Sequence, residues 1–219
     1  LNEKDMVNLI FAAAPSQNHT LAALAKEPNI DWSRVRAFHM DEYIGFGREK
    51  EQSFGYYLDK HLFSLVPIGE IHYVDGAAND PEAECKRYES LLSAYPPDMV
   101  FLGIGENAHI AFNDPWVADF QDKKLVKVVP LDETCRTQQV HDGCFPTLGD
   151  VPTHALTLTV PALFQAAHLF CTVPGPTKAE AVRHTITAEI SEAYPSTIMR
   201  RHKHATMYCD RESGRFLLG

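Results

Sequence analysis

Short apolar runs alternate along this chain with segments that read as helices, and this alternation constrains the fold more than any other feature. The buried-strand candidates are residues 6–13, 35–40, 71–74, 97–104, 125–129, 155–160, 168–173 and 205–209. The helix candidates are residues 20–26, 51–65, 81–95 and 178–186. Strands that alternate with helices need crossover connections, and near-continuous apolar strands need cover on both faces. The pattern therefore predicts an α/β fold of three αβα layers around a mainly parallel, Rossmann-like sheet.

The chain has 219 residues, which fits a single domain. Proline and glycine cluster at strand ends and do not separate two compositional halves, so we expect one domain over residues 1–219. Position 1 is leucine, from which we expect native N-terminal residues to precede this sequence.

Charge and cysteine usage exclude several classes of protein. The net charge is -9 with only 20 Lys and Arg, which argues against a broad nucleic-acid surface. The start of the chain is polar, and no apolar run approaches the roughly 18 residues that cross a bilayer. The five cysteines form no CxxC pair. We therefore expect reduced thiols, no metal site, no membrane or nucleic-acid partner, and a cytoplasmic location.

Ligands of parallel sheets bind where strands end, and four polar segments follow predicted strands. The first contains Ser16, Gln17 and Asn18, just before a helix. Hydroxyl, amide and backbone N–H groups at a helix start can hold a phosphate, although the same residue types also cap helices for structural reasons. The segment is neither a GxGxxG motif nor a P-loop, so nucleotide binding has no direct support.

The second segment carries two adjacent carboxylates, Asp41 and Glu42, at the end of a strand. Because side chains alternate along a strand, one can face the crevice while the other points away. A carboxylate placed there could remove a proton from a carbon next to a carbonyl. The alternative is a solvated acid pair at a loop start.

The third segment follows a strand that ends in glycines, and it contains His109 bracketed by Asn107 and Asp114. His109 is a candidate acid/base, and Asp114 could orient its ring and set its tautomer. The fourth segment places Lys178 in a first helical turn, where the helix dipole disfavours a cation, and this indicates an anionic partner. Arg136 could be a second cation for a phosphate or simply a surface residue.

Together these segments resemble the glucosamine-6-phosphate deaminase/isomerase family over about residues 9–213. The most specific motifs are MDEY at 40–43 and GENAHIAFNDP at 105–115, with GPTKA at 175–179 and MYCD at 207–210 in support. The sister 6-phosphogluconolactonase family shares the fold but typically has another sequence after the histidine. The motif at 105–115 therefore favours the deaminase branch.

The resemblance implies roles for the matching residues. Asp41 resembles the base that shuttles a proton between C1 and C2 of the open-chain sugar, and His109 the group that assists ring opening. Asp114 stands where the family usually has glutamate as the partner of that histidine. Lys178 resembles a phosphate ligand, and Ser16 matches a phosphate-loop hydroxyl.

The chain also departs from the family pattern, as a divergent member would. Gln17, Asn18 and His19 replace the usual Gly-Gly-Thr, so side chains occupy a turn where backbone normally approaches the phosphate. Asn107 replaces an acidic residue, and an amide stabilises an imidazolium less well than a carboxylate does. Arg136 is the nearest candidate for the family's phosphate arginine.

The resemblance implies an enzyme that isomerises and deaminates an aminohexose 6-phosphate to a ketohexose 6-phosphate and ammonia. We expect a small sugar phosphate as the partner and no metal or organic cofactor, because the substrate's own carbonyl and amine supply the electron sink. Family members often form homo-oligomers, so a homo-oligomer is possible here, and no stretch of the sequence decides the oligomeric state. Two alternatives stay open: lactone hydrolysis on the same fold, and a non-catalytic sugar-phosphate sensor.

Overall fold

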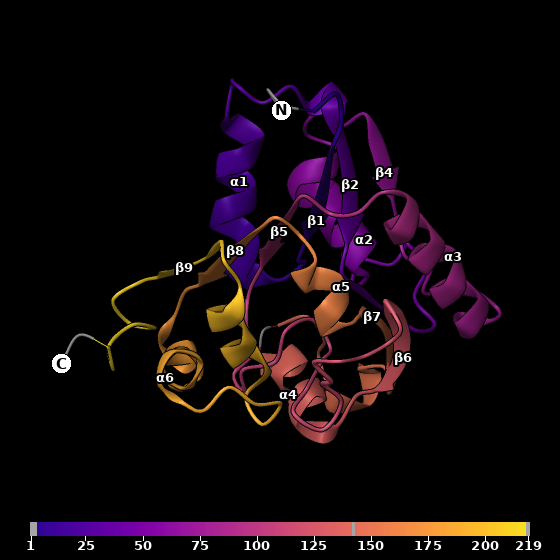
Figure 1. Ribbon diagram of the computed structural model, residues 1–219. Coiled ribbons are helices and arrows are strands. Elements are labelled where there is room, and N and C mark those ends of the chain that lie inside the picture. Colours follow the sequence, from indigo (N-terminus) through magenta and orange to yellow (C-terminus); the bar gives the residue numbers. More distant parts are fainter. Residues whose placement is uncertain (1–3, 142, 218–219) are drawn as a thin grey trace.

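A six-stranded parallel sheet forms the centre of the protein in the computed structural model, which describes residues 4–141 and 143–217 (Figure 1). The strand order is β4-β2-β1-β5-β8-β9, and every neighbouring pair is parallel. The strands are β1 (Val7–Phe11), β2 (Val35–His39), β4 (Glu70–His72), β5 (Met99–Leu102), β8 (His168–Val173) and β9 (Ala205–Cys209). The predicted mainly parallel α/β fold is confirmed.

Both faces of the central strand β1 are covered by apolar side chains. Leu9 and Phe11 of β1 pack in one apolar cluster with Leu21 of the first helix, whereas Ile10 packs in the other with Tyr88 of the third. This alternation confirms the expected helices on both faces. The helices are α1 (Asn18–Lys26), α2 (Phe54–Leu58), α3 (Pro81–Ala94), α4 (Glu133–His141), α5 (Val160–Phe164) and α6 (Ala179–Thr187). Among the residues described, none of these helices is long and apolar enough to span a bilayer.

A second, antiparallel sheet of three strands was not predicted. Its order is β3 (Asp41–Tyr43), β7 (His154–Leu158) and β6 (Val126–Pro130). The chain leaves β2 and enters β3 after the single residue Met40. Asp41 therefore begins a strand of the small sheet, where the sequence had suggested only the end of a parallel strand.

The helix expected at residues 51–65 is shorter and divided. The α-helical part is α2, and a turn of π-helix follows at Asp59–Phe63. The Ser53 side chain caps α2 by accepting the N–H of Tyr56 at 3.0 Å. This capped start fixes the position of Phe54, which lies in the wall of the site described next.

Candidate active site

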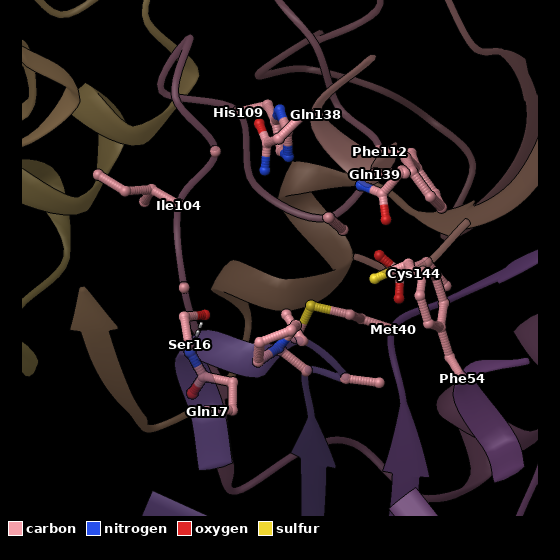
Figure 2. A pocket seen from close by; sticks show the side chains of 18 of the residues that line it. Ser16, Gln17, Met40, Phe54, Ile104, His109, Phe112, Gln138, Gln139 and Cys144 are labelled. Carbon is pink, nitrogen blue, oxygen red and sulfur yellow. Dashed lines mark hydrogen bonds between the residues drawn. The ribbon is translucent and has the colours of Figure 1, made fainter. Parts of the chain in front are cut away.

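A cavity of about 210 Å³ lies beyond the carboxyl ends of β1, β5 and β8 (Figure 2). Parallel strands end at a common edge, so loops far apart in the sequence meet there. Ser16, Asp41, His109 and Lys178 all line this cavity. The predicted convergence of these four side chains is therefore confirmed by the structure, while their chemical roles stay predictions.

Asp41 and Glu42 face different surroundings, as strand alternation predicts. Asp41 lines the cavity and is only 8% exposed. The Glu42 carboxylate instead accepts three backbone N–H groups, from Tyr43 and Gly55 at 3.0 Å and from Phe54 at 3.1 Å. Glu42 thus anchors the start of α2, and Asp41 is the carboxylate available for chemistry.

Burial makes both carboxylates weaker acids than usual. The pKa of Asp41 lies well above its ordinary value because of burial and the neighbouring Glu42 charge. Burial also raises the pKa of Glu42, to about 7, against the opposing effect of its three N–H donors. In its ionised form Asp41 is consequently a stronger base than an exposed aspartate.

His39 braces the backbone that carries Asp41. Its Nδ1 lies 2.9 Å from the Asp41 carbonyl, which can only accept, so Nδ1 carries the proton. Its Nε2 accepts the N–H of Val74 at 2.9 Å. Burial lowers the pKa of His39 to about 4, which keeps the ring neutral. Its two hydrogen bonds tie the start of β3 to the residues that follow β4.

Asn107 and Asp114 together fix the ring of His109. His109 Nδ1 lies 2.7 Å from Asn107 Oδ1 and 3.1 Å from Asp114 Oδ1, and Asn107 Nδ2 donates to Asp114 Oδ1 at 2.8 Å. Asn107 Oδ1 must therefore be the acceptor, so Nδ1 carries the proton and Nε2 is left as a base. Asp114, although shorter than glutamate, still reaches the histidine.

Asp114 is fully buried, yet its pKa is lowered. Burial alone would raise this pKa, but hydrogen bonds and charge from His109, together with Asn107 and the Cys135 thiol, favour the ionised form. An ionised Asp114 holds the proton of His109 on Nδ1.

The loop around His109 tolerates little change. A side chain at Gly105 would place its Cβ 2.1 Å from His109 Cε1, so only glycine fits beneath the ring. Ala108 and Ala111 adopt positive φ angles of 66° and 51°. Such conformations cost roughly 1 kcal/mol each and are kept where surrounding contacts impose them. The backbone on both sides of His109 is therefore strained, a feature common at functional sites.

The other end of the cavity is built from two short 3₁₀ turns at helix starts. Ser16 and Gln17 belong to the turn Pro15–Gln17 ahead of α1, and Lys178 ends the turn Pro176–Lys178 ahead of α6. Gly175 reverses the chain there with a φ of 96°, which favours glycine. Lys178 is 8% exposed and lines the cavity, so it can meet a bound anion.

Two predicted ligands are not brought to the cavity. Asn18 is exposed, and its Oδ1 accepts the hydroxyl of Tyr57. The Arg136 guanidinium donates to the carbonyls of Leu148 at 2.6 Å and Val151 at 2.9 Å. The prediction that these two side chains share the phosphate site is wrong, because each is committed to partners elsewhere.

The sequence missed several lining residues, labelled in Figure 2 as Phe54, Gln138, Gln139 and Cys144. Helix α4 supplies both glutamines, and Gln139 is held by the Tyr43 hydroxyl, which donates to Oε1 at 2.8 Å. Helix α4 has few apolar residues, so no periodicity predicts it from the sequence. The adjacent side-chain amides of Gln138 and Gln139 were the only hint of a binding role. Among the described residues, no group of three or more His, Cys, Asp or Glu could hold a metal.

An αβα fold that delivers a buried carboxylate, an oriented histidine and a lysine to one cavity defines an α/β enzyme with an acid–base site. Comparison with known proteins agrees. Residues 1–208 match the family described as glucosamine-6-phosphate isomerases/6-phosphogluconolactonase. The chain belongs to this family and is an enzyme of it.

Curated relatives carry a common name. The glucosamine-6-phosphate deaminase of Bacillus cytotoxicus is 37% identical over 188 residues, which are 86% of this chain and 70% of that protein. A Bacillus cereus deaminase is 36% identical over the same shares.

Solved structures show the same fold. A monomeric glucosamine-6-phosphate deaminase of the NagB superfamily has a TM-score of 0.87 and 30% identity, covering 97% of this chain and 89% of its own. The 6-phosphogluconolactonase of Thermotoga maritima has a TM-score of 0.74 and 23% identity, covering 95% and 86%. The lactonase likeness supports the fold alone.

Proposed function

We propose that this protein converts an aminohexose 6-phosphate, with glucosamine 6-phosphate as the leading candidate, to a ketohexose 6-phosphate and ammonia. The observation that carries the proposal is that Asp41, His109 and Lys178 line one cavity, with His109 held as the Nδ1–H tautomer. The names of the most similar deaminases support the choice of substrate.

The mechanism assigns one task to each end of the cavity. Lys178 and Ser16 hold the phosphate of the sugar. His109 Nε2, left unprotonated, takes the proton of the O1 hydroxyl as the ring opens and passes a proton to O5. Opening the ring produces the C1 aldehyde, which makes the C2–H bond acidic.

Asp41 then moves a proton between two carbons. Its carboxylate removes the C2 proton to give an enolamine and returns a proton to C1, leaving an iminium at C2. Water adds to C2 and ammonia departs, so the overall reaction is a hydrolytic deamination. The raised pKa of Asp41 suits this task. Between the two transfers the carboxyl holds the proton, and burial stabilises this neutral, protonated state.

The test measures ammonia release from glucosamine 6-phosphate and, separately, from its galactosamine isomer. We expect turnover of at least one isomer, and loss of turnover in Asp41→Asn. A lactonase assay with 6-phosphogluconolactone runs in parallel. Lactone hydrolysis without ammonia release, or ligand binding without any turnover, would sink the proposal.

We further propose that the protein acts in the cytoplasm. All five cysteines are free thiols, a state that a reducing compartment maintains. Light scattering of the purified protein would decide whether it forms a homo-oligomer. One structural relative, 30% identical to this chain, is described as monomeric.

A further inference from the structure

The Gln17 side chain occupies a junction of three strands. Its amide lies between the turn after β1 and the end of β8, where Nε2 donates to the Thr172 carbonyl at 3.1 Å. Gly103, which follows β5, leaves the space for it, since a Cβ at Gly103 would stand 2.9 Å from Gln17 Nε2. Gln17 is only 1% exposed, so this amide is part of the floor of the site and not a solvated side chain.

The hydrogen bonds of this amide determine the direction of the Ser16 hydroxyl. The Thr172 carbonyl can only accept, so the atom facing it is the amide nitrogen. The same nitrogen lies 3.1 Å from Ser16 Oγ, as the dashed line in Figure 2 marks. With one Nε2 proton directed to each oxygen, Ser16 Oγ is the acceptor of that contact. Its own O–H proton must then point elsewhere.

The cavity is the place left for that proton. Ser16 lines the cavity, and among the described residues the hydrogen bond from Gln17 is the only one that its side chain makes. A hydroxyl that already accepts a hydrogen bond also donates more strongly, because the two bonds polarise one another. Lys178 lines the same cavity, so an anion there would meet an ammonium and an aimed O–H donor.

We propose that Gln17 is a positioning residue, which aims and polarises the Ser16 hydroxyl as a donor to the substrate phosphate. The segment at residues 15–20 has no glycines that would let the backbone approach an anion. In this chain the Gln17 amide instead orients a serine hydroxyl towards the anion. The inference rests on the proposed function for the placement of the phosphate. It predicts that the contributions of Gln17 and Ser16 to phosphate binding are coupled.

The experiment is a double-mutant cycle on ligand binding. Fructose 6-phosphate affinity is measured by calorimetry for wild type, Gln17→Met, Ser16→Ala and the double variant, since methionine keeps the length of the side chain without its donor. We expect Ser16→Ala to weaken binding about tenfold or more, as for a hydrogen bond to a charged group. Gln17→Met should weaken it several-fold in wild type and have almost no effect when Ser16 is already alanine.

Controls separate positioning from damage to the fold. The melting temperature of each variant is recorded, and the Thr20–Thr172 hydroxyl contact at 3.1 Å should keep α1 joined to β8 without Gln17. Fructose, which lacks the phosphate, should bind all four proteins equally. Equal losses from Gln17→Met in both backgrounds, or no loss in either, would overturn the inference.

The double-mutant cycle and the ammonia assay can fail independently of each other. Coupled binding without ammonia release would defeat the proposed function and leave the inference intact. Normal ammonia release with uncoupled binding would do the reverse.

Discussion

The two ends of the cavity are built in different ways. The end proposed to bind the phosphate, or phosphate end, rests on 3₁₀ turns that follow strands of the large parallel sheet, and it offers Ser16 and Lys178. The end proposed for the chemistry, or chemical end, takes Asp41 from the small antiparallel sheet and His109 from a strained loop. A hydrogen bond from His39 braces the Asp41 backbone, and one to Asn107 braces the His109 ring. The comparison suggests that phosphate binding relies on a few donors at helix starts. Proton transfer instead relies on side chains that hydrogen bonds hold in a fixed orientation. Changes at the two ends should therefore give different kinetic signatures.

The largest effect is expected at Asp41. Replacing its carboxylate by an amide in Asp41→Asn removes the base, so kcat for ammonia release should fall about 10³-fold, within the range found for general bases. Fructose 6-phosphate affinity, measured by calorimetry, should change little because the phosphate end is untouched. A kcat close to wild type would show that another group moves the proton.

A smaller loss is expected when His109 loses its orienting amide. Asn107→Ala removes the acceptor at 2.7 Å from Nδ1 and the donor to Asp114. We expect kcat to fall about 10²-fold with KM nearly unchanged, because the wrong tautomer and a mobile ring are poor catalysts. Asn79→Ala, at an exposed asparagine, is the matched control. Equal kinetics for the two variants would remove Asn107 from the site.

The opposite signature is expected at the phosphate end. Lys178→Met should raise KM about 10–30-fold and leave kcat within a few-fold, because the proposed contact with the phosphate is the same in the substrate and the transition state. Lys123→Met, at an exposed lysine, should leave both constants unchanged. A fall in kcat without a rise in KM would contradict the division between the two ends.

The smallest effect concerns Glu42 and the stability of the chemical end. Its folded pKa of about 7 exceeds the ordinary 4.5, so its contribution to stability is greatest below pH 4.5 and is lost as pH rises towards 7. Relative to Glu42→Gln, wild type should lose about 2 kcal/mol of unfolding free energy between pH 5 and pH 7.5. Urea titrations at the two pH values measure this difference, and identical pH dependence for both proteins would contradict it.

The parallel sheet was accessible from sequence because its strands are near-continuous apolar runs. Strand β3 was not, since three residues give no periodicity and β3 pairs with β7, more than a hundred residues further on. The motifs around Asp41 and His109 identified two residues that line the cavity, and their chemical roles stay predictions. Arg136 failed as a phosphate ligand because its guanidinium donates to backbone carbonyls 12 and 15 residues further along the chain, a pairing that helical or strand periodicity does not reveal.

The central claim is that Asp41 carries one proton from C2 to C1 of the sugar. The direct measurement is turnover of glucosamine 6-phosphate in D₂O, followed by NMR of the fructose 6-phosphate formed. We predict that C1 acquires a single new hydrogen in one stereochemical position, part of it protium transferred from C2, and that Asp41→Asn forms no such product. Continued turnover by Asp41→Asn, or a new hydrogen distributed over both C1 positions, would contradict the account.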